Sequence, residues 1–289
     1  MKSQKGRAMC LRGMAVATVV AVVSAASAAQ AADLGAPQEP PPEPVVQDEW
    51  SVTVTPYLWG AALSGNGALR GFPVSVDVPF SETFENLDIG LMGVVEISNG
   101  AFGAFLNAEY VDVSDDQIFH PKLPIIGQQE VNVDAGMKMT IISAGVSYRV
   151  YEADLGGTTL FNAPRVFALS PLAGVRWTRL EGNLTVAVDQ FSREVSDSEQ
   201  WLDPFVGARA DIDLSSRWNL TLEGDVGGFD VGSKISLNGQ AYLGYRTHFL
   251  GHETILRLGY RALYQDYSNG GFEWDVTQHG PVVGASFKF

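Results

Sequence analysis

From Trp50 onward, much of the chain alternates between apolar and polar residues with a period of two, which is the spacing of side chains on a β-strand. The last ten residues show this pattern clearly. One face of an extended strand there would be apolar and end in aromatics, and the other would be small or polar: Pro281, Val283, Ala285, Phe287 and Phe289 against Val282, Gly284, Ser286 and Lys288. Such a strand suits a wall with lipid on one side and a polar space on the other.

The same alternation recurs in ten segments, most of them near or above the ~9–11 residues that cross a bilayer as a tilted strand. They are residues 50–60, 89–97, 102–110, 142–149, 167–178, 202–214, 218–226, 236–249, 256–265 and 280–289. The pattern predicts an all-β fold, a closed antiparallel up-and-down transmembrane β-barrel of about ten strands. Twelve strands, if residues 184–200 add a hairpin, or eight are the alternatives.

The connections support this topology because short and long ones alternate along the chain. Asn99-Gly100, Ser215-Ser216 and Gly251-His252 predict tight turns, whereas residues 64–87, 114–134, 181–200 and 268–272 predict longer loops at the opposite end. Short periplasmic turns and longer external loops are typical of outer-membrane barrels. The connection from Tyr151 to Arg165 is long for a periplasmic turn.

A soluble β-sandwich or a lipocalin-like cup would show the same alternation, so strand length and aromatic placement decide between them. Sandwich strands average about 5–6 residues, roughly half the length seen here. Aromatic residues also fall near the predicted strand ends, where girdles at the two membrane interfaces would lie. They are Tyr57, Trp59, Tyr110, Tyr148, Trp177, Trp201, Trp218, Tyr264, Trp274, Phe287 and Phe289.

The start of the chain predicts export. Four basic residues precede an Ala- and Val-rich run from Met14 to Ala29, and Ala29-Gln30-Ala31 fits a small-x-small cleavage site. We therefore expect a signal peptide at residues 1–31 with cleavage after Ala31, a Pro-rich periplasmic tail at 32–49, and the barrel at 50–289. An uncleaved anchor is the alternative, which the polar, Pro-rich sequence that follows disfavours.

Charge and cysteine usage narrow the partners. The chain has 19 basic and 33 acidic residues, and it becomes more acidic when the signal is removed, which argues against nucleic acid. Its one cysteine, Cys10, lies in the signal, so the mature chain is expected to have neither disulfides nor a cysteine-ligated metal.

A short Gly-x-Arg element repeats on the polar face of four predicted strands. It occurs at Gly174/Arg176, Gly207/Arg209, Gly244/Arg246 and Gly259/Arg261. Residues two apart project the same way, and an arginine facing lipid at mid-depth would cost ~2–4 kcal/mol, so these arginines should face the lumen. Candidates for a charged lumen network are Glu109, Arg176, Arg209, Glu223, Asp225, Arg246, Arg257 and Arg261, of which Glu109, Arg176, Arg209, Glu223, Asp225 and Arg261 are expected at similar depth.

Two interpretations of this network stay open. It could be an ion-pair lattice that holds a narrow barrel shut, since arginine pairs bidentately with carboxylates, or it could be a charged constriction that selects small solutes. Eight strands leave an interior that side chains fill and 16–18 leave a channel, so ten strands favour the first interpretation.

Catalysis and cofactors find little support in the sequence. The four histidines have no metal-ligand spacing, and His279 lies near Asp275 and Glu273 as a surface histidine beside acids commonly does. The Gly-rich stretch 224–233 does not lead into a helix, as a phosphate site would require. We expect no enzyme activity, no cofactor and no metal.

Several motifs together resemble one class of proteins. The signal, the Pro-rich tail, Pro56-Tyr57-Leu58-Trp59, Asp225-Val-Gly-Gly-Phe229, Gly259-Tyr-Arg261 and the strand ending in Phe289 resemble a proteobacterial group of Gram-negative outer-membrane barrels, similar in plan to the outer-membrane protein A-like and W-like barrels. The resemblance implies a closing strand marked by Phe287 and Phe289, and contact with outer-membrane lipid, lipopolysaccharide and the barrel-assembly machinery. It assigns no functional residues and leaves the oligomeric state open.

The expected function is therefore a porin-like barrel with a narrow charged lumen, which serves envelope structure or passes small hydrophilic solutes. A surface binding or adhesion protein that uses long external loops is the alternative, and an outer-membrane enzyme is a further one.

Overall fold

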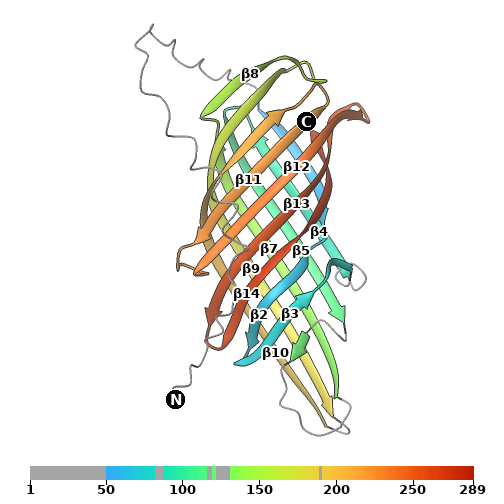
Figure 1. The fold of residues 1–289 in the computed structure, drawn as a ribbon, viewed down its shortest axis with the longest axis vertical. Helices are drawn as coiled ribbons and strands as arrows, with labels where there is room; N and C mark the ends of the chain where they lie inside the picture. Colours follow the sequence, from blue (N-terminus) through green and yellow to red (C-terminus); the bar gives the residue numbers. More distant parts are fainter. Residues whose placement is uncertain (1–49, 82–86, 116–118, 122–130, 189–190) are drawn as a thin grey trace, which may run out of the picture. The chain divides into compact units, whose positions relative to one another are not determined.

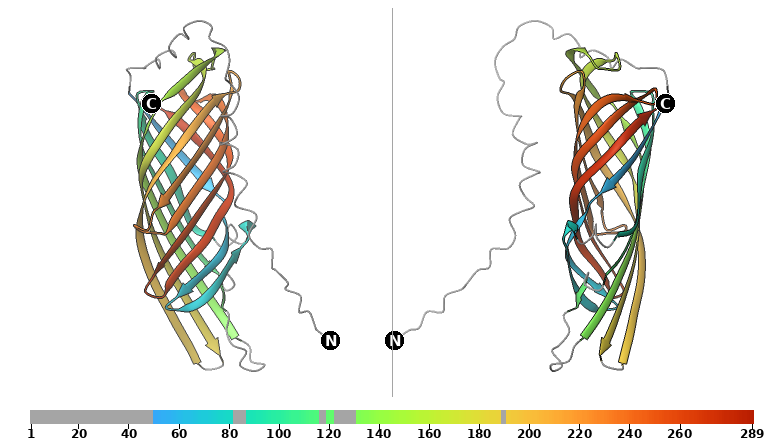
Figure 2. Two further views of the ribbon diagram at one scale, coloured as in Figure 1. Left: turned by 60° about the vertical axis from the view of Figure 1, so that its left-hand side comes forward. Right: turned by 90° about the vertical axis from the view of Figure 1, so that its right-hand side faces the viewer.

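Ten antiparallel strands close into a barrel in the computed structural model, which describes residues 50–81, 87–115, 119–121, 131–188 and 191–289 (Figures 1 and 2). The barrel strands are β1 (Ser51–Trp59), β4 (Leu87–Ser98), β5 (Phe102–Asp115), β7 (Val131–Tyr148), β9 (Pro164–Val188), β10 (Phe191–Asp213), β11 (Trp218–Gly228), β12 (Ile235–Phe249), β13 (His252–Asn269) and β14 (Phe272–Lys288). β14 pairs with β1, with Phe287 opposite Val54, so the sheet closes on itself. The all-β class and the ten-strand barrel are thus confirmed, whereas the predicted signal, the Ala31 cleavage site and the tail lie outside the described residues.

Four shorter strands extend the barrel wall, and two of them correct an expectation. Residues 64–87 were predicted to be a long loop, yet they contain most of β2 (Ala62–Leu69) and all of β3 (Phe72–Val78). These two strands form a hairpin, in which β2 pairs with the N-terminal half of β14. β6 (Phe119–Pro121), within the predicted 114–134 loop, pairs with β3. The hairpin turns at Arg70 and Gly71, which both have positive φ, and only the alternation of Val74, Val76 and Val78 marks it in the sequence.

The region that could have added two wall strands does not do so. Instead of forming a separate hairpin at 184–200, β9 and β10 stay paired up to Val188 and Phe191, and β7 runs beside β9 as far as Val131. The long connection after Tyr151 holds β8 (Tyr151–Thr158), which folds back onto β9. The barrel count therefore stays at ten.

The two ends of the barrel differ. At one end, which we call the turn end, lie the β4–β5, β10–β11 and β12–β13 turns together with Ser51 and Lys288. Asn99 stabilises the first turn, since its Oδ1 accepts a hydrogen bond from the Phe102 N–H over 2.8 Å and Gly100 takes a φ of 89°. At the other end, the extended end, β7, β9 and β10 project beyond their neighbours (Figure 2). Among the described residues, no helix has the length and apolar character needed to span a membrane.

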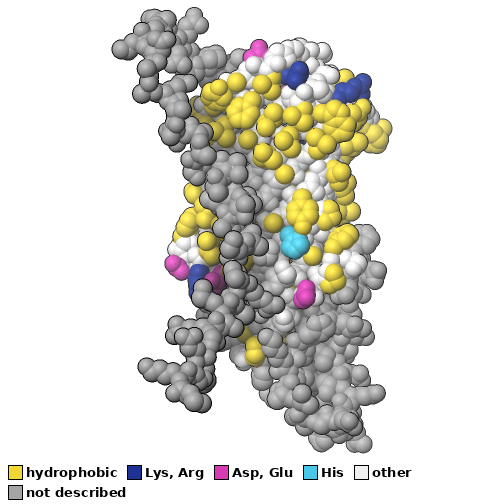
Figure 3. All heavy atoms as spheres, in the orientation of Figure 1, with side chains coloured by type: hydrophobic (Ala, Val, Ile, Leu, Met, Phe, Trp, Pro, Cys, Tyr) yellow, Lys and Arg dark blue, Asp and Glu magenta, His cyan; other side chains and the backbone are white. Residues whose placement is uncertain are grey.

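The outer surface carries an apolar belt toward the turn end (Figure 3). Outward side chains there are large and exposed, among them Leu91, Val206, Leu222, Leu258 and Val283. On the extended-end side of the belt, polar residues reappear in a cross-strand row of Asp112, Lys138 and Glu181. The Asp112 carboxylate accepts a 2.8 Å hydrogen bond from Lys138, which raises the pKa of that ammonium group. A closed sheet with such a belt is the arrangement of outer-membrane barrels, whose belt contacts lipid.

The interior of the extended half is filled by an apolar core, and this corrects the predicted aromatic girdles. Tyr148, Trp218 and Phe289 do lie exposed at the turn end. Trp59, Trp201 and Trp274, however, point inward and are at most 6% exposed. They pack with Ile141, Leu63, Leu263, Val276 and other buried side chains into one cluster, in which the Trp201 ring stacks on Tyr267 at 4.3 Å. Among the described residues, buried apolar side chains therefore occupy the interior of the extended half.

Candidate functional site

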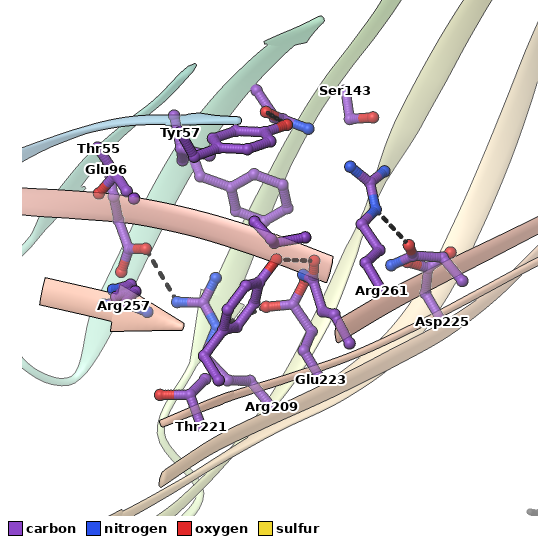
Figure 4. Close-up of a pocket in the computed structure, with 18 of the residues that line it drawn as sticks. Thr55, Tyr57, Glu96, Ser143, Arg209, Thr221, Glu223, Asp225, Arg257 and Arg261 are labelled. Atoms are coloured by element: carbon purple, nitrogen blue, oxygen red, sulfur yellow. Dashed lines mark hydrogen bonds and ion pairs between the residues drawn. The ribbon is translucent and has the colours of Figure 1, made fainter. Parts of the chain in front are cut away.

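The predicted arginines and carboxylates face the lumen because the strand alternation places lipid-facing and lumen-facing residues in turn. On β13, Leu256, Leu258 and Tyr260 lie on the outer face and are exposed. Arg261, the next residue after Tyr260, lies on the opposite face and is 3% exposed. Figure 4 shows Arg209, Glu223, Asp225, Arg257 and Arg261 converging on one space inside the barrel. These five side chains all line the central cavity, and their partners follow from the structure.

Arg261 and Glu109 form an ion pair on the turn-end side of the apolar core. Arg261 donates from a terminal nitrogen to Glu109 Oε1 over 2.7 Å, and both side chains are at most 4% exposed. Asn107 also donates to Glu109 over 2.6 Å, and the Arg261 guanidinium lies 4.4 Å from the centre of the Trp59 ring. A buried guanidinium held by a carboxylate and an aromatic face is well compensated for its lost hydration.

Arg176 and Asp225 form a second buried pair, and Asn238 links it to the first. One terminal nitrogen of Arg176 donates to both carboxylate oxygens of Asp225, each over 2.9 Å. Asn238 donates to Asp225 over 2.8 Å and accepts from Arg261 Nε over 3.0 Å. Arg176 also donates to Ser236 over 2.8 Å. The two pairs are therefore one hydrogen-bonded network across five strands.

Arg209 bridges two carboxylates closer to the turn end. It donates to Glu223 over 2.7 Å and to Glu96 over 2.9 Å. Gln240 donates to the other oxygen of Glu223 over 2.6 Å and accepts from the Tyr242 hydroxyl. These side chains are partly exposed to the lumen.

Arg246 and Arg257 lie apart from these pairs. Arg246 pairs with Asp213 near the turn end. Arg257 donates to the Ser286 hydroxyl over 2.7 Å, and no carboxylate among the described residues lies within 4.0 Å of it. The predicted network residues thus form several contacts, and most of these join strands that are not hydrogen-bonded neighbours, such as β9 and β11 or β5 and β13.

The glycines of the Gly-x-Arg element make room for a neighbouring strand. A Cβ on Gly174 would lie 2.3 Å from the Ala144 carbonyl oxygen and 2.7 Å from the Phe205 ring. The Phe205 ring in that space receives the Arg176 guanidinium, 5.0 Å from its centre. The space beside Gly174 is thus filled by an aromatic side chain from the next strand, β10.

Sequence reasoning missed the neutral members of the network. Asn238 joins the Arg176–Asp225 and Arg261–Glu109 pairs, and each of the other neutral members hydrogen-bonds to a charged residue or to another neutral member: Tyr57, Asn107, Gln240 and Ser286. Each lies on the polar face of its predicted strand, so the sequence predicts which side of the sheet it occupies. The sequence does not predict its hydrogen-bond partners, because these depend on the register between strands.

Two cavities occupy the lumen on the turn-end side of the apolar core, and the network residues themselves line the first. The central one, of about 240 Å³, is lined by side chains from all ten barrel strands. A second, of about 500 Å³, lies at the turn end and shares Thr53 and Arg257 with the first. The apolar core stands between these cavities and the extended end. The described lumen is therefore a polar chamber toward one end of the barrel.

The acid–histidine group of β14 lies on the outer surface. His279 Nδ1 forms a 2.6 Å hydrogen bond with the Tyr260 hydroxyl, and Asp275 accepts from Tyr264 over 2.8 Å. Each group thus has a tyrosine partner. In the described ranges, no cluster of three or more acidic, histidine or cysteine residues is placed to bind a metal ion.

Comparisons with known proteins return barrels of the bacterial outer membrane. No family model matches the chain, and no curated protein matches it. Among solved structures it is similar to the outer membrane protease OmpT from Escherichia coli, with 9% identity over 84% of this chain and 98% of that one, and a TM-score of 0.44. It is also similar to Ail, the attachment invasion locus protein of Yersinia pestis, in complex with the heparin analogue sucrose octasulfate (11% identity, 83% and 98% coverage, TM-score 0.32). A third is a major outer membrane protein from Thermus thermophilus (15% identity, 83% and 98% coverage, TM-score 0.35).

Proposed function

We propose that this outer-membrane β-barrel is a sealed structural barrel of the envelope rather than an open pore for hydrophilic solutes. The observation that carries the proposal is the apolar core in the extended half, where Ile141, Leu263 and Val276 are fully buried. A hydrated solute would have to pass among buried apolar side chains, which offer no replacement for its water. The ion-pair network on the turn-end side of the core would hold the surrounding strands together from inside the barrel.

Planar bilayer recordings test this proposal. The full barrel, refolded and reconstituted, should give no stepwise conductance, and liposomes that contain it should not swell in arabinose. Arg261→Ala should stay silent too, because the apolar core above Arg261 remains in place. An open porin reconstituted in parallel controls for fusion. Discrete conductance from the unmodified chain would refute the sealed barrel and support the charged constriction.

Surface binding is a second candidate, favoured by the extended end. β9 and β10 stay paired up to Val188 and Phe191, with β7 alongside, so this end presents three joined strands rather than separate loops. Replacing residues 182–197 with two glycines should abolish adhesion of expressing cells to immobilised matrix proteins or glycans. Retained heat-modifiable gel mobility would show that the barrel still folds. Adhesion unchanged by this truncation would dismiss the second candidate.

Two further expectations belong to the same proposal. We expect Phe287 and Phe289 to be used by the barrel-assembly machinery, since β14 is the strand that closes the barrel. We also expect no catalysis from the His279 group, because its nearest hydrogen-bond partner is Tyr260 rather than an acid.

A further inference from the structure

The wall has a break in its hydrogen-bond ladder between β1 and β4. Their pairing ends at Pro56 and Gly93. Beyond it, the Trp59 N–H donates to the Met92 sulfur over 3.3 Å instead of to a carbonyl oxygen, and the Gly60 N–H donates to Pro281 on the opposite neighbour, β14. β1 thus leaves β4 and follows β14, so the two edges separate.

An apolar cavity of about 360 Å³ lies at this break. Its inner lining comes from core residues such as Val111, Met137 and Met139, which are at most 8% exposed. Its outer lining comes from the apolar belt, with Leu58, Leu258 and Val283 between 51% and 63% exposed. Because one cavity touches both faces, it passes through the wall on the membrane side. Its volume falls within the ~300–1,000 Å³ typical of small-molecule sites.

Two unsatisfied polar groups line this otherwise apolar space. The Gln278 side chain is 0% exposed, and neither its amide nitrogen nor its oxygen has a hydrogen-bond partner among the described residues. The same holds for the Trp59 ring nitrogen. Buried polar groups are almost always paired, so a fully buried amide with both a free donor and a free acceptor indicates a missing partner.

The charge of the lining indicates what that partner is. Glu109 is the charged residue in the lining, and its carboxylate is already taken by Arg261 and Asn107. An anionic head group would lose its hydration beside a carboxylate and gain no cation, and a cationic one would have to compete with Arg261 for Glu109. A hydroxyl or neutral amide could accept from Gln278 or Trp59 and donate to the Gln278 oxygen.

We propose that this break is a side portal and that the cavity binds a neutral amphiphile entering from the lipid, with an alkyl or aromatic body and one hydroxyl or amide group. The apolar body lies among Val111, Met137 and Met139, and the polar group reaches Gln278. This inference does not rest on the sealed lumen. The absence of conductance would not contradict binding in this cavity, and the presence of conductance would not by itself demonstrate it.

Quenching of tryptophan emission by 10-bromo-1-decanol tests the proposal, because Trp59 lines the cavity. The full chain in lipid nanodiscs should show a saturable component above the linear quenching caused by probe dissolved in the lipid. Trp59→Phe should remove that component. Val111→Phe, which fills the cavity, should weaken it at least tenfold. Val175→Phe, the same change on a lipid-facing position that is 42% exposed, should leave it unchanged.

Gln278→Leu separates the polar contact from the apolar one. It should weaken binding of the alcohol by about tenfold and leave binding of 1-bromodecane unchanged, since one or two hydrogen bonds are lost. This variant also keeps the test decisive if Val111→Phe fails to fold. Purely linear quenching, or saturable quenching that neither substitution alters, would overturn the proposal. In that case the amide is satisfied by trapped water or by another segment of this chain.

Discussion

At the scale of single residues, the buried ion pairs are the costliest places to intervene. Asp225→Ala would leave the Arg176 guanidinium, whose side chain is 3% exposed, without its carboxylate partner. We expect the free energy of unfolding to fall by about 3–5 kcal/mol, because an uncompensated buried charge remains. Urea unfolding in lipid vesicles, followed by tryptophan fluorescence, measures the loss.

The matched control is a pair of the same chemistry on the surface. Arg179 and Glu181 are also joined, over 2.7 Å, but their side chains are 47% and 41% exposed. Glu181→Ala should change stability by at most about 1 kcal/mol. Equal losses in the two variants would mean that the lumen is hydrated well enough to screen the Arg176–Asp225 pair.

The alternation of apolar and polar residues along each strand predicted which charged residues face inward. It did not predict which of these residues contact each other. Arg176 on β9 and Asp225 on β11 are 49 residues apart and meet over the intervening strand β10, so their contact depends on the stagger of the strands around the barrel. Alternation within one strand holds no information on stagger. Trp59, by contrast, was misassigned although the signal existed: it lies two positions from Tyr57 on the face opposite the exposed Leu58.

At the scale of elements, the Gly-x-Arg motif fixes how closely neighbouring strands approach. Gly174→Ala would push a methyl group against the Ala144 carbonyl oxygen and the Phe205 ring. We expect a loss of about 1–3 kcal/mol, as for other overpacked sites, together with displacement of Phe205 from Arg176. The same unfolding assay measures the stability.

Gly239→Ala is the corresponding control on β12. A Cβ there meets no atom within 4 Å, so the substitution should be neutral or stabilise by up to about 1 kcal/mol through the unfolded chain. A Gly174→Ala variant as stable as Gly239→Ala would show that Phe205 has free space beside it.

The ten barrel strands were predictable because each carries its own two-residue period and is bounded by turn residues. β2 and β3 were not, because short strands with Gly65, Gly67 and Gly71 between apolar positions look like a loop. Their strand character comes from pairing with β14, a partner about two hundred residues away. The break between β1 and β4 is equally invisible in sequence, since β1 changes neighbours without changing its alternation.

At the scale of the whole molecule, the apolar belt predicts how the barrel sits in the membrane. Short turns mark the periplasmic side of outer-membrane barrels, so the turn end should face the periplasm and the extended end the outside. Val206 and Leu214 test the position of the belt, because both lie on β10 or just beyond it and are 52% and 50% exposed. Val206 lies seven residues inside the end of β10 at Asp213, whereas Leu214 follows that end.

A charge at the two positions should therefore cost different amounts. Val206→Arg places a guanidinium within the belt and should lower the free energy of unfolding in lipid by about 2–4 kcal/mol, whereas Leu214→Arg, at the interface, should cost about 0–1 kcal/mol. The same pair measured in detergent micelles should differ less, because a micelle deforms around a charge more readily than a bilayer does. Equal costs in the bilayer would mean that lipid does not cover Val206, and the membrane would then have to lie elsewhere along the barrel, where the outward row of Asp112, Lys138 and Glu181 would itself have to be buried.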